Sequence, residues 1–152
     1  MAKKQPKIKS IEETLWESAN KLRGSVEPSE YKHVVLSLIF LKYANDRFDE
    51  RRNELIAEGK GAFVDQAVFY NAKNVFYIEE QSRWSFIMEN AKQNDIAIKI
   101  DKALSSIEDS NPSLKGALPS NYYSGLGLDR AKLAALLDEI NKIDTLKDPE
   151  ND

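Results

Sequence analysis

The sequence predicts an all-α domain, a compact bundle of about five to six helices around a long, buried central helix. Apolar residues recur at intervals of three and four along most of the chain, as they do on one face of a helix. With 152 residues and 41% hydrophobic content, the chain can form a single core. Strand-like composition is confined to Val75–Ile78, which has no evident partner strand.

The first helix is expected to begin near residue 11. Ser10 and Glu13 have the spacing of a capping box, in which two side chains satisfy the free amide groups at a helix start. Gly24 can end the helix in a left-handed conformation. Its apolar stripe consists of Ile11, Leu15, Ala19 and Leu22.

The central helix is expected to run from Pro28, a residue favoured at the first helical position, to just before Gly59. Apolar side chains point in nearly every direction between Val34 and Tyr43, which predicts burial on all sides. We expect one long helix, either straight or bent near Asn45-Asp46.

The second half of the chain predicts shorter elements. Residues 63–74 form either a short helix or an irregular segment, and 75–78 an extended segment packed on helices. Helical spacing returns over 80–92, where Trp84, Ile87, Met88 and Ala91 share one side. Asp95 and Asp129 can cap two further helices, separated by a loop of about 18 residues that is long enough to suggest a function.

Composition excludes several classes of protein. There is no cysteine, so disulfides and thiolate sites are absent, in keeping with a cytoplasmic location. No apolar run is long enough to span a membrane. The net charge is −3, but four lysines in the first nine residues contribute +4, so the remainder carries −7 and repels a phosphate backbone on average.

The search for catalytic, cofactor-binding and metal-binding residues identifies none. His33 is the single histidine, so sites that need two histidines cannot form within the chain. Gly125-Leu126-Gly127 follows no strand and lacks the third glycine of a dinucleotide loop. Asn111-Pro112 shares only two residues with the Asn-Pro-Pro-aromatic motif of adenine methyltransferases, and we interpret it as a turn that ends a helix.

Basic residues provide the candidate contacts. Lys21, Arg23, Lys32 and His33 gather around the turn between the first two predicted helices and are the candidates for contact with DNA or another subunit. Arg47, Arg51 and Arg52 alternate with acidic residues and predict an exposed salt-bridge face. The lysines of residues 1–10 fit either a flexible tail or a phosphate contact, and Trp16 and Trp84 are expected to pack.

Several stretches together resemble the N-terminal region of the modification subunit of type I restriction-modification systems. The most specific runs from Glu30-Tyr31-Lys32-His33-Val34-Val35 to Tyr43 and continues to Phe48-Asp49-Glu50-Arg51-Arg52. The resemblance covers about residues 12–145, in the family's order. Glu79 departs from it, since similar proteins often have proline there. The other matching stretches are Leu15-Trp16-Glu17, Ala19–Gly24, Val75–Ile78, Arg83-Trp84, Asn94–Ile96, Ile100-Asp101, Ile107-Glu108 and Asn111–Gly116.

The resemblance implies that residues 11–145 form a helical domain, with a basic tail over 1–10 and an acidic linker over 146–152 that leads to a methyltransferase domain outside this sequence. In the family that domain binds S-adenosylmethionine and methylates adenine N6. The implied partners are DNA, a specificity subunit, a second modification subunit and a restriction subunit. The expected role is subunit contact and closure around DNA without catalysis; the alternative is a purely structural domain that does not touch DNA.

Overall fold

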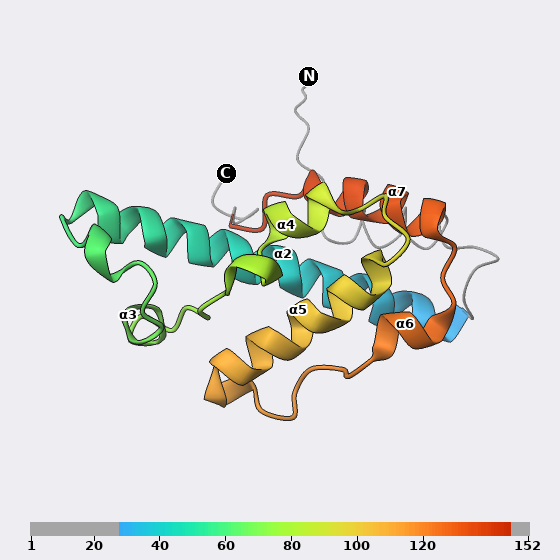
Figure 1. Ribbon diagram of the computed structural model, residues 1–152, viewed down its shortest axis with the longest axis horizontal. Coiled ribbons are helices and arrows are strands. Elements are labelled where there is room, and N and C mark those ends of the chain that lie inside the picture. The colour runs from blue at the N-terminus through green and yellow to red at the C-terminus, as the bar shows by residue number, and fades with distance from the viewer. Residues whose placement is uncertain (1–27, 147–152) are drawn as a thin grey trace, which may run out of the picture.

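Helix α2, Pro28–Ala57, forms the axis of the molecule, and the other elements pack along it (Figure 1). The computed structural model describes residues 28–146, with side chains from His33 onward. This range contains helices and no strand, which confirms the predicted all-α class. The remaining elements are η1 (Gly61–Phe63), α3 (Val68–Asn71), η2 (Glu80–Ser82), α4 (Trp84–Glu89), α5 (Ile96–Ser110), η3 (Pro112–Leu114), α6 (Tyr122–Leu126) and α7 (Arg130–Asn141).

The bounds of α2 agree with the prediction. The helix begins at Pro28 and ends two residues before Gly59, which has a φ of +78° that favours glycine. Val34, Leu38 and Leu41 are fully or almost fully buried. The prediction of burial on all sides is wrong for one face, however, because Leu36 and Tyr43 remain 44% and 43% exposed.

An aromatic cluster anchors α3 and the segment after it to the second half of α2. The ring of Phe48 stacks on Tyr70 with centroids 4.7 Å apart, and the edge of Tyr77 meets Phe48 at 5.6 Å. Residues 75–79 form neither helix nor strand, the backbone of Glu79 is extended, and Val75 and Ile78 are buried. The predicted packing of this segment on helices is therefore confirmed.

Asn111 joins that segment to the end of α5. Its Oδ1 accepts the backbone N–H of Tyr77 at 2.8 Å, and its Nδ2 donates to the carbonyls of Tyr77 at 2.9 Å and Ile107 at 2.8 Å. Asn71 donates to the same Oδ1 at 3.0 Å. Asn111 also ends α5, as predicted, and its amide is used entirely within the fold.

The predicted helical region 80–92 is divided in two. Arg83 has an extended backbone between η2 and α4, so one continuous helix does not form there. The extended residue lets α4 start against α2, where the buried backbone N–H of Trp84 donates to Asn45 Oδ1 at 2.9 Å. The Trp84 indole N–H reaches Asn141 Oδ1 at 2.8 Å, which confirms the predicted packing role of this residue.

Two predictions in the next part of the chain need correction. Asp95 precedes α5, but its carboxylate accepts from Lys99 Nζ at 2.7 Å and makes no cap hydrogen bond. The predicted loop over 111–128 contains η3 and the short helix α6. That helix depends on Asp101 in α5, whose carboxylate accepts the backbone N–H groups of Tyr123 at 2.8 Å and Ser124 at 2.9 Å.

The last helix, α7, agrees with the prediction. Asp129 caps it by accepting the backbone N–H of Ala131 at 3.3 Å. The helix lies along α2 (Figure 1). Its buried residues are Leu133, Leu136, Leu137, Glu139 and Ile140.

Candidate contact surfaces

The predicted basic cluster lies mostly outside the described part of the chain. Lys21 and Arg23 precede it, and Lys32 has a described backbone in α2 but no described side chain. His33 is exposed on α2, as predicted. The structure therefore places one member of the cluster and does not test whether the four residues come together.

An apolar strip runs along α2 beside His33. Leu36, Phe40 and Tyr43 are spaced by four and three residues, so they share one face of the helix. Phe40 is half-buried and meets the Phe76 ring at a centroid distance of 5.9 Å, whereas the other two are exposed. Exposed aromatic and aliphatic side chains in a row are typical of contact surfaces.

The three arginines predicted to form an exposed salt-bridge face have separate roles. Arg47 pairs with Glu50 at 2.9 Å on the surface, which confirms the prediction for that residue. Arg51 contradicts it: its side chain is buried, its Nε donates to the Phe69 carbonyl at 3.0 Å, and its Nη1 pairs with Glu54 at 3.1 Å. Arg52 has neither kind of partner, since no hydrogen bond or ion pair joins it to the described residues.

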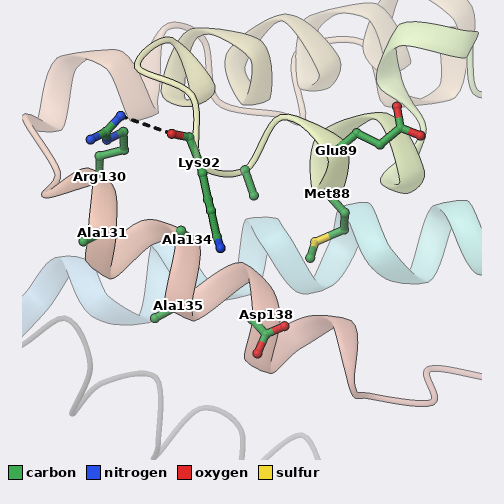
Figure 2. A pocket seen from close by; sticks show the side chains of 9 residues that line it. Met88, Glu89, Lys92, Arg130, Ala131, Ala134, Ala135 and Asp138 are labelled. Atoms are coloured by element: carbon green, nitrogen blue, oxygen red, sulfur yellow. Dashed lines mark hydrogen bonds between the residues drawn. The ribbon is translucent and has the colours of Figure 1, made fainter.

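A groove of about 700 Å³ separates α4 from α7 (Figure 2). Arg130 closes one end, because its Nη1 donates to the Lys92 carbonyl at 3.1 Å and to Asn94 Oδ1 at 2.6 Å. Figure 2 shows the Lys92 side chain extending from the connection after α4 toward α7. The other lining residues are Met88, Glu89, Ala91, Ala131, Ala134, Ala135 and Asp138.

Ala131, Ala134 and Ala135 lie at helical spacing on α7, so small side chains form its side of the groove. The lining offers apolar contact with charged groups of both signs at the rim, and it contains no serine, cysteine or histidine. Such a surface can receive part of another protein. Sequence reasoning missed this groove because its two walls lie about 40 residues apart in the chain.

The titration properties of the described residues concern packing. Burial raises the pKa of Tyr123 well above 10, and its hydroxyl donates to the Val34 carbonyl at 2.5 Å. The hydrogen bond from Lys99 lowers the pKa of the exposed Asp95 carboxyl.

Within residues 28–146, no three His, Cys, Asp or Glu side chains gather as they would around a metal ion. None of the helices in that range combines the length and the apolar character that a bilayer crossing requires.

Comparison with known proteins identifies the family to which the chain belongs. The model of the HsdM N-terminal domain matches residues 11–142, which is most of the chain. The chain belongs to this family. It is also 31% identical, over 148 residues, to the type I restriction enzyme MjaIX methylase subunit of Methanocaldococcus jannaschii. That alignment covers 88% of this chain and 26% of the relative, so the chain spans about a quarter of the relative's length.

Proposed function

We propose that this chain is the N-terminal helical domain of the modification subunit of a type I restriction-modification system. The match of the HsdM N-terminal domain over residues 11–142 carries the proposal. The similarity to a methylase subunit supports it, as does the all-helical arrangement around α2. The tail over 1–10, the domain over 11–145 and the linker over 146–152 are part of this proposal.

The whole subunit, in this proposal, is an adenine-specific DNA methyltransferase that transfers a methyl group from S-adenosylmethionine to adenine N6. The catalytic and cofactor-binding residues belong to a part of the protein beyond this sequence. The domain itself joins the subunits and helps close the enzyme around DNA. Its partners are DNA, the specificity subunit, a second modification subunit and the restriction subunit, and the assembly works in the cytoplasm.

The proposed DNA or subunit contacts of this domain are Lys21, Arg23, Lys32 and His33. Three of them carry a positive charge at neutral pH, and His33 is exposed. A local basic patch of this kind can hold phosphates even though the chain outside its first nine residues is acidic. His33 lies three residues before Leu36, the first residue of the apolar strip of Leu36, Phe40 and Tyr43, which is suited to a protein partner.

The test is methyl transfer and DNA binding by the enzyme assembled from the full-length modification and specificity subunits. We expect transfer to adenine N6 that depends on added S-adenosylmethionine, and calorimetry of this chain alone should detect no binding of that cofactor. Stoichiometric cofactor binding to the isolated chain, or methylation at another base position, contradicts the proposal.

The basic cluster is tested by replacing all four of its residues with alanine. The slope of log K against log salt is negative, and each lost phosphate contact should make it shallower by about 0.9. The matched control replaces Lys73, Lys102 and Lys115, three exposed lysines, with alanine and removes the same formal charge. An equal slope change in both variants removes the four residues as specific contacts.

The second candidate is a purely structural domain whose surface serves only subunit contacts. The exposed Leu36 and Tyr43 favour it, together with the net charge of −7 outside the first nine residues. Photo-crosslinking from DNA in the assembled enzyme distinguishes the two candidates. Crosslinks to this domain favour the DNA-closing role, and their absence favours the structural one.

A further inference from the structure

Arg52 differs from every other arginine in the described part of the chain. Arg47, Arg51, Arg83 and Arg130 each donate at least one hydrogen bond to a carboxylate, an amide or a carbonyl oxygen. Arg52 makes none, and its Nε is the one buried side-chain nitrogen or oxygen in residues 33–146 without a partner. Folded proteins seldom leave a buried donor unsatisfied, because the donor loses the hydrogen bond that water gives it in the unfolded chain.

The terminal nitrogens of Arg52 are accessible. They have no hydrogen-bond partner within the described residues, and they are not buried, so solvent reaches them. The guanidinium of Arg52 is therefore covered at Nε and open at its other end. An arginine in this position can turn its planar edge toward a ligand that arrives from solvent.

A second guanidinium is held close to Arg52. Arg83 lies over the Phe48 ring at 4.7 Å from the centroid, and its Nε donates to the Ile78 carbonyl at 3.1 Å, so its position is fixed. Phe48 and Arg52 lie four residues apart on α2, so their side chains are neighbours on one face of the helix. Burial raises the pKa of Asp49, and the positive charges of Arg83 and Arg52 both oppose that rise, in keeping with two guanidiniums on the same side of α2. Arg52 and Arg83 therefore lie on the same side of α2, beside the Phe48 ring, and we call the surface formed by these two side chains the notch.

The acidic groups near the notch do not neutralise Arg52 through contact. Asp49 accepts a hydrogen bond from Asn45 Nδ2 at 3.1 Å, and no ion pair joins it to either arginine. Asp65 is near Tyr70 and Tyr77 and is likewise unpaired with Arg52. Asp46, which also lies near Asp49, is paired with Lys42, and Glu79 lies near Tyr77. The carboxylates around the notch thus outnumber its two cations, so it has no long-range attraction for anions and a ligand must be held by short, directed hydrogen bonds.

We propose that Arg52 and Arg83 form an oxyanion-binding notch that takes one backbone phosphate of DNA. Arg52 supplies the unpartnered edge of its guanidinium, Arg83 supplies the second positive charge, and the buried Phe48 ring, which stacks on Tyr70, supports Arg83. This inference rests on the proposed function, which brings DNA to this domain. It adds a contact that is separate in the chain from Lys21, Arg23, Lys32 and His33.

Arginine Nε–H signals in the nitrogen-15 NMR spectrum of the 152-residue chain report directly on the notch. The probes are inorganic phosphate, acetate and a short DNA duplex at low ionic strength, with phosphate groups matched in concentration. We expect the duplex to shift the Arg52 signal more than inorganic phosphate does, and acetate to shift it least. The Arg47 signal is the internal control, because Glu50 already occupies that guanidinium.

Other outcomes overturn the proposal. A shift by inorganic phosphate but not by the duplex means a site for a small anion, and a shift by acetate alone means a site for a carboxylate of a protein partner. No shift with any probe means that Nε is satisfied by bound water. In each of these cases, methyl transfer by the assembled enzyme would still stand as the test of the proposed function.

Variants measure the contact independently. For binding of the duplex, Arg52→Gln should make the negative slope of log K against log salt shallower by about 0.9 more than Arg47→Gln does. Arg47→Gln is the control because it removes the same charge from the same helix. Arg52→Lys keeps the charge and removes the planar edge, and we expect it to weaken binding nearly as much. Equal effects of Arg52→Gln and Arg47→Gln, or full binding by Arg52→Lys when both variants unfold like the parent chain, overturn the proposal.

Discussion

The side-chain oxygen of Asn45 accepts the backbone N–H of Trp84, which lies 39 residues further along the chain, at 2.9 Å in the buried core. The same asparagine donates to Asp49 at 3.1 Å, so both halves of its amide are used. This contact sets where α4 begins on α2. The groove between α4 and α7 and the position of Arg83 both follow from it, because Arg83 immediately precedes Trp84.

Asn45→Ala should therefore destabilise the fold. The substitution leaves the Trp84 N–H buried without an acceptor, which costs about 1–3 kcal/mol in the free energy of unfolding. Urea denaturation followed by circular dichroism measures the change. Asn53→Ala, at an exposed position of the same helix, is the control and should change the free energy by less than about 0.5 kcal/mol. Equal losses in both variants would show that the contact does not stabilise the fold.

Asn111→Ala should have a larger effect. The variant removes two donated and two accepted hydrogen bonds and leaves the Tyr77 N–H without its acceptor. We expect a loss of about 3 kcal/mol or more, since several buried groups lose their partners together. Ser113→Ala, two residues along on the surface, should be nearly neutral. A loss below about 1 kcal/mol for Asn111→Ala would mean that water replaces the amide.

The elements that sequence reasoning predicted correctly are those determined by nearby residues. The ends of α2 depend on Pro28 and Gly59, and the start of α7 depends on Asp129, whose acceptor role involves a neighbour two residues away. The non-helical segment 75–79 could be predicted because its residues favour a strand over a helix, and a short run without a partner strand forms no sheet.

The incorrect predictions involve distant partners. The alternation of charges predicts an exposed ion pair for Arg51, but the carbonyl that accepts its Nε hydrogen bond in the interior belongs to Phe69, 18 residues away. Helix α6 is only five residues long and contains Gly125, so it is not predicted locally. Its first turn is capped by Asp101, more than 20 residues earlier. The unpartnered Arg52 and the α4–α7 groove are consequences of tertiary packing, so the pattern of residues contains no direct sign of either.

Tyr123 should couple stability to alkaline pH, and Tyr123→Phe should remove that coupling. Burial raises the folded-state pKa of Tyr123 well above 10, so the neutral hydroxyl contributes its stability below the unfolded pKa of about 10. That contribution is lost as pH rises through the folded pKa, because the unfolded chain ionises first. Phenylalanine removes the hydrogen bond to Val34 and should cost about 1 kcal/mol at pH 7.

The difference in free energy of unfolding between the parent chain and Tyr123→Phe should then shrink above pH 10, because the variant has no hydroxyl to ionise at this position. Denaturant unfolding at a series of pH values measures it. Tyr70 and Tyr77, whose pKa values are also raised by burial, remain in both proteins and cancel in the comparison. A difference that stays constant from pH 7 to above pH 10 would contradict the predicted coupling.

Leu36→Glu should separate assembly from folding. Leu36 is 44% exposed on the apolar strip of α2, so the charge is placed largely in water and the free energy of unfolding should fall by less than about 1 kcal/mol. If the strip contacts another subunit, the buried glutamate leaves an unpaired charge in the interface and should weaken assembly at least tenfold, about 1.4 kcal/mol or more. Size-exclusion chromatography of the enzyme with its specificity subunit measures this loss.

Ile98→Glu is the matched control for that prediction. Ile98 is 48% exposed, but it lies on α5 rather than on α2, so the variant adds the same charge at a comparable exposure on another element. Assembly should be retained with Ile98→Glu and lost with Leu36→Glu, while both chains unfold at similar denaturant concentrations. Normal assembly by Leu36→Glu would exclude the strip as a subunit contact. Loss of assembly in both would point to a general effect of negative charge, because the chain outside its first nine residues already carries −7.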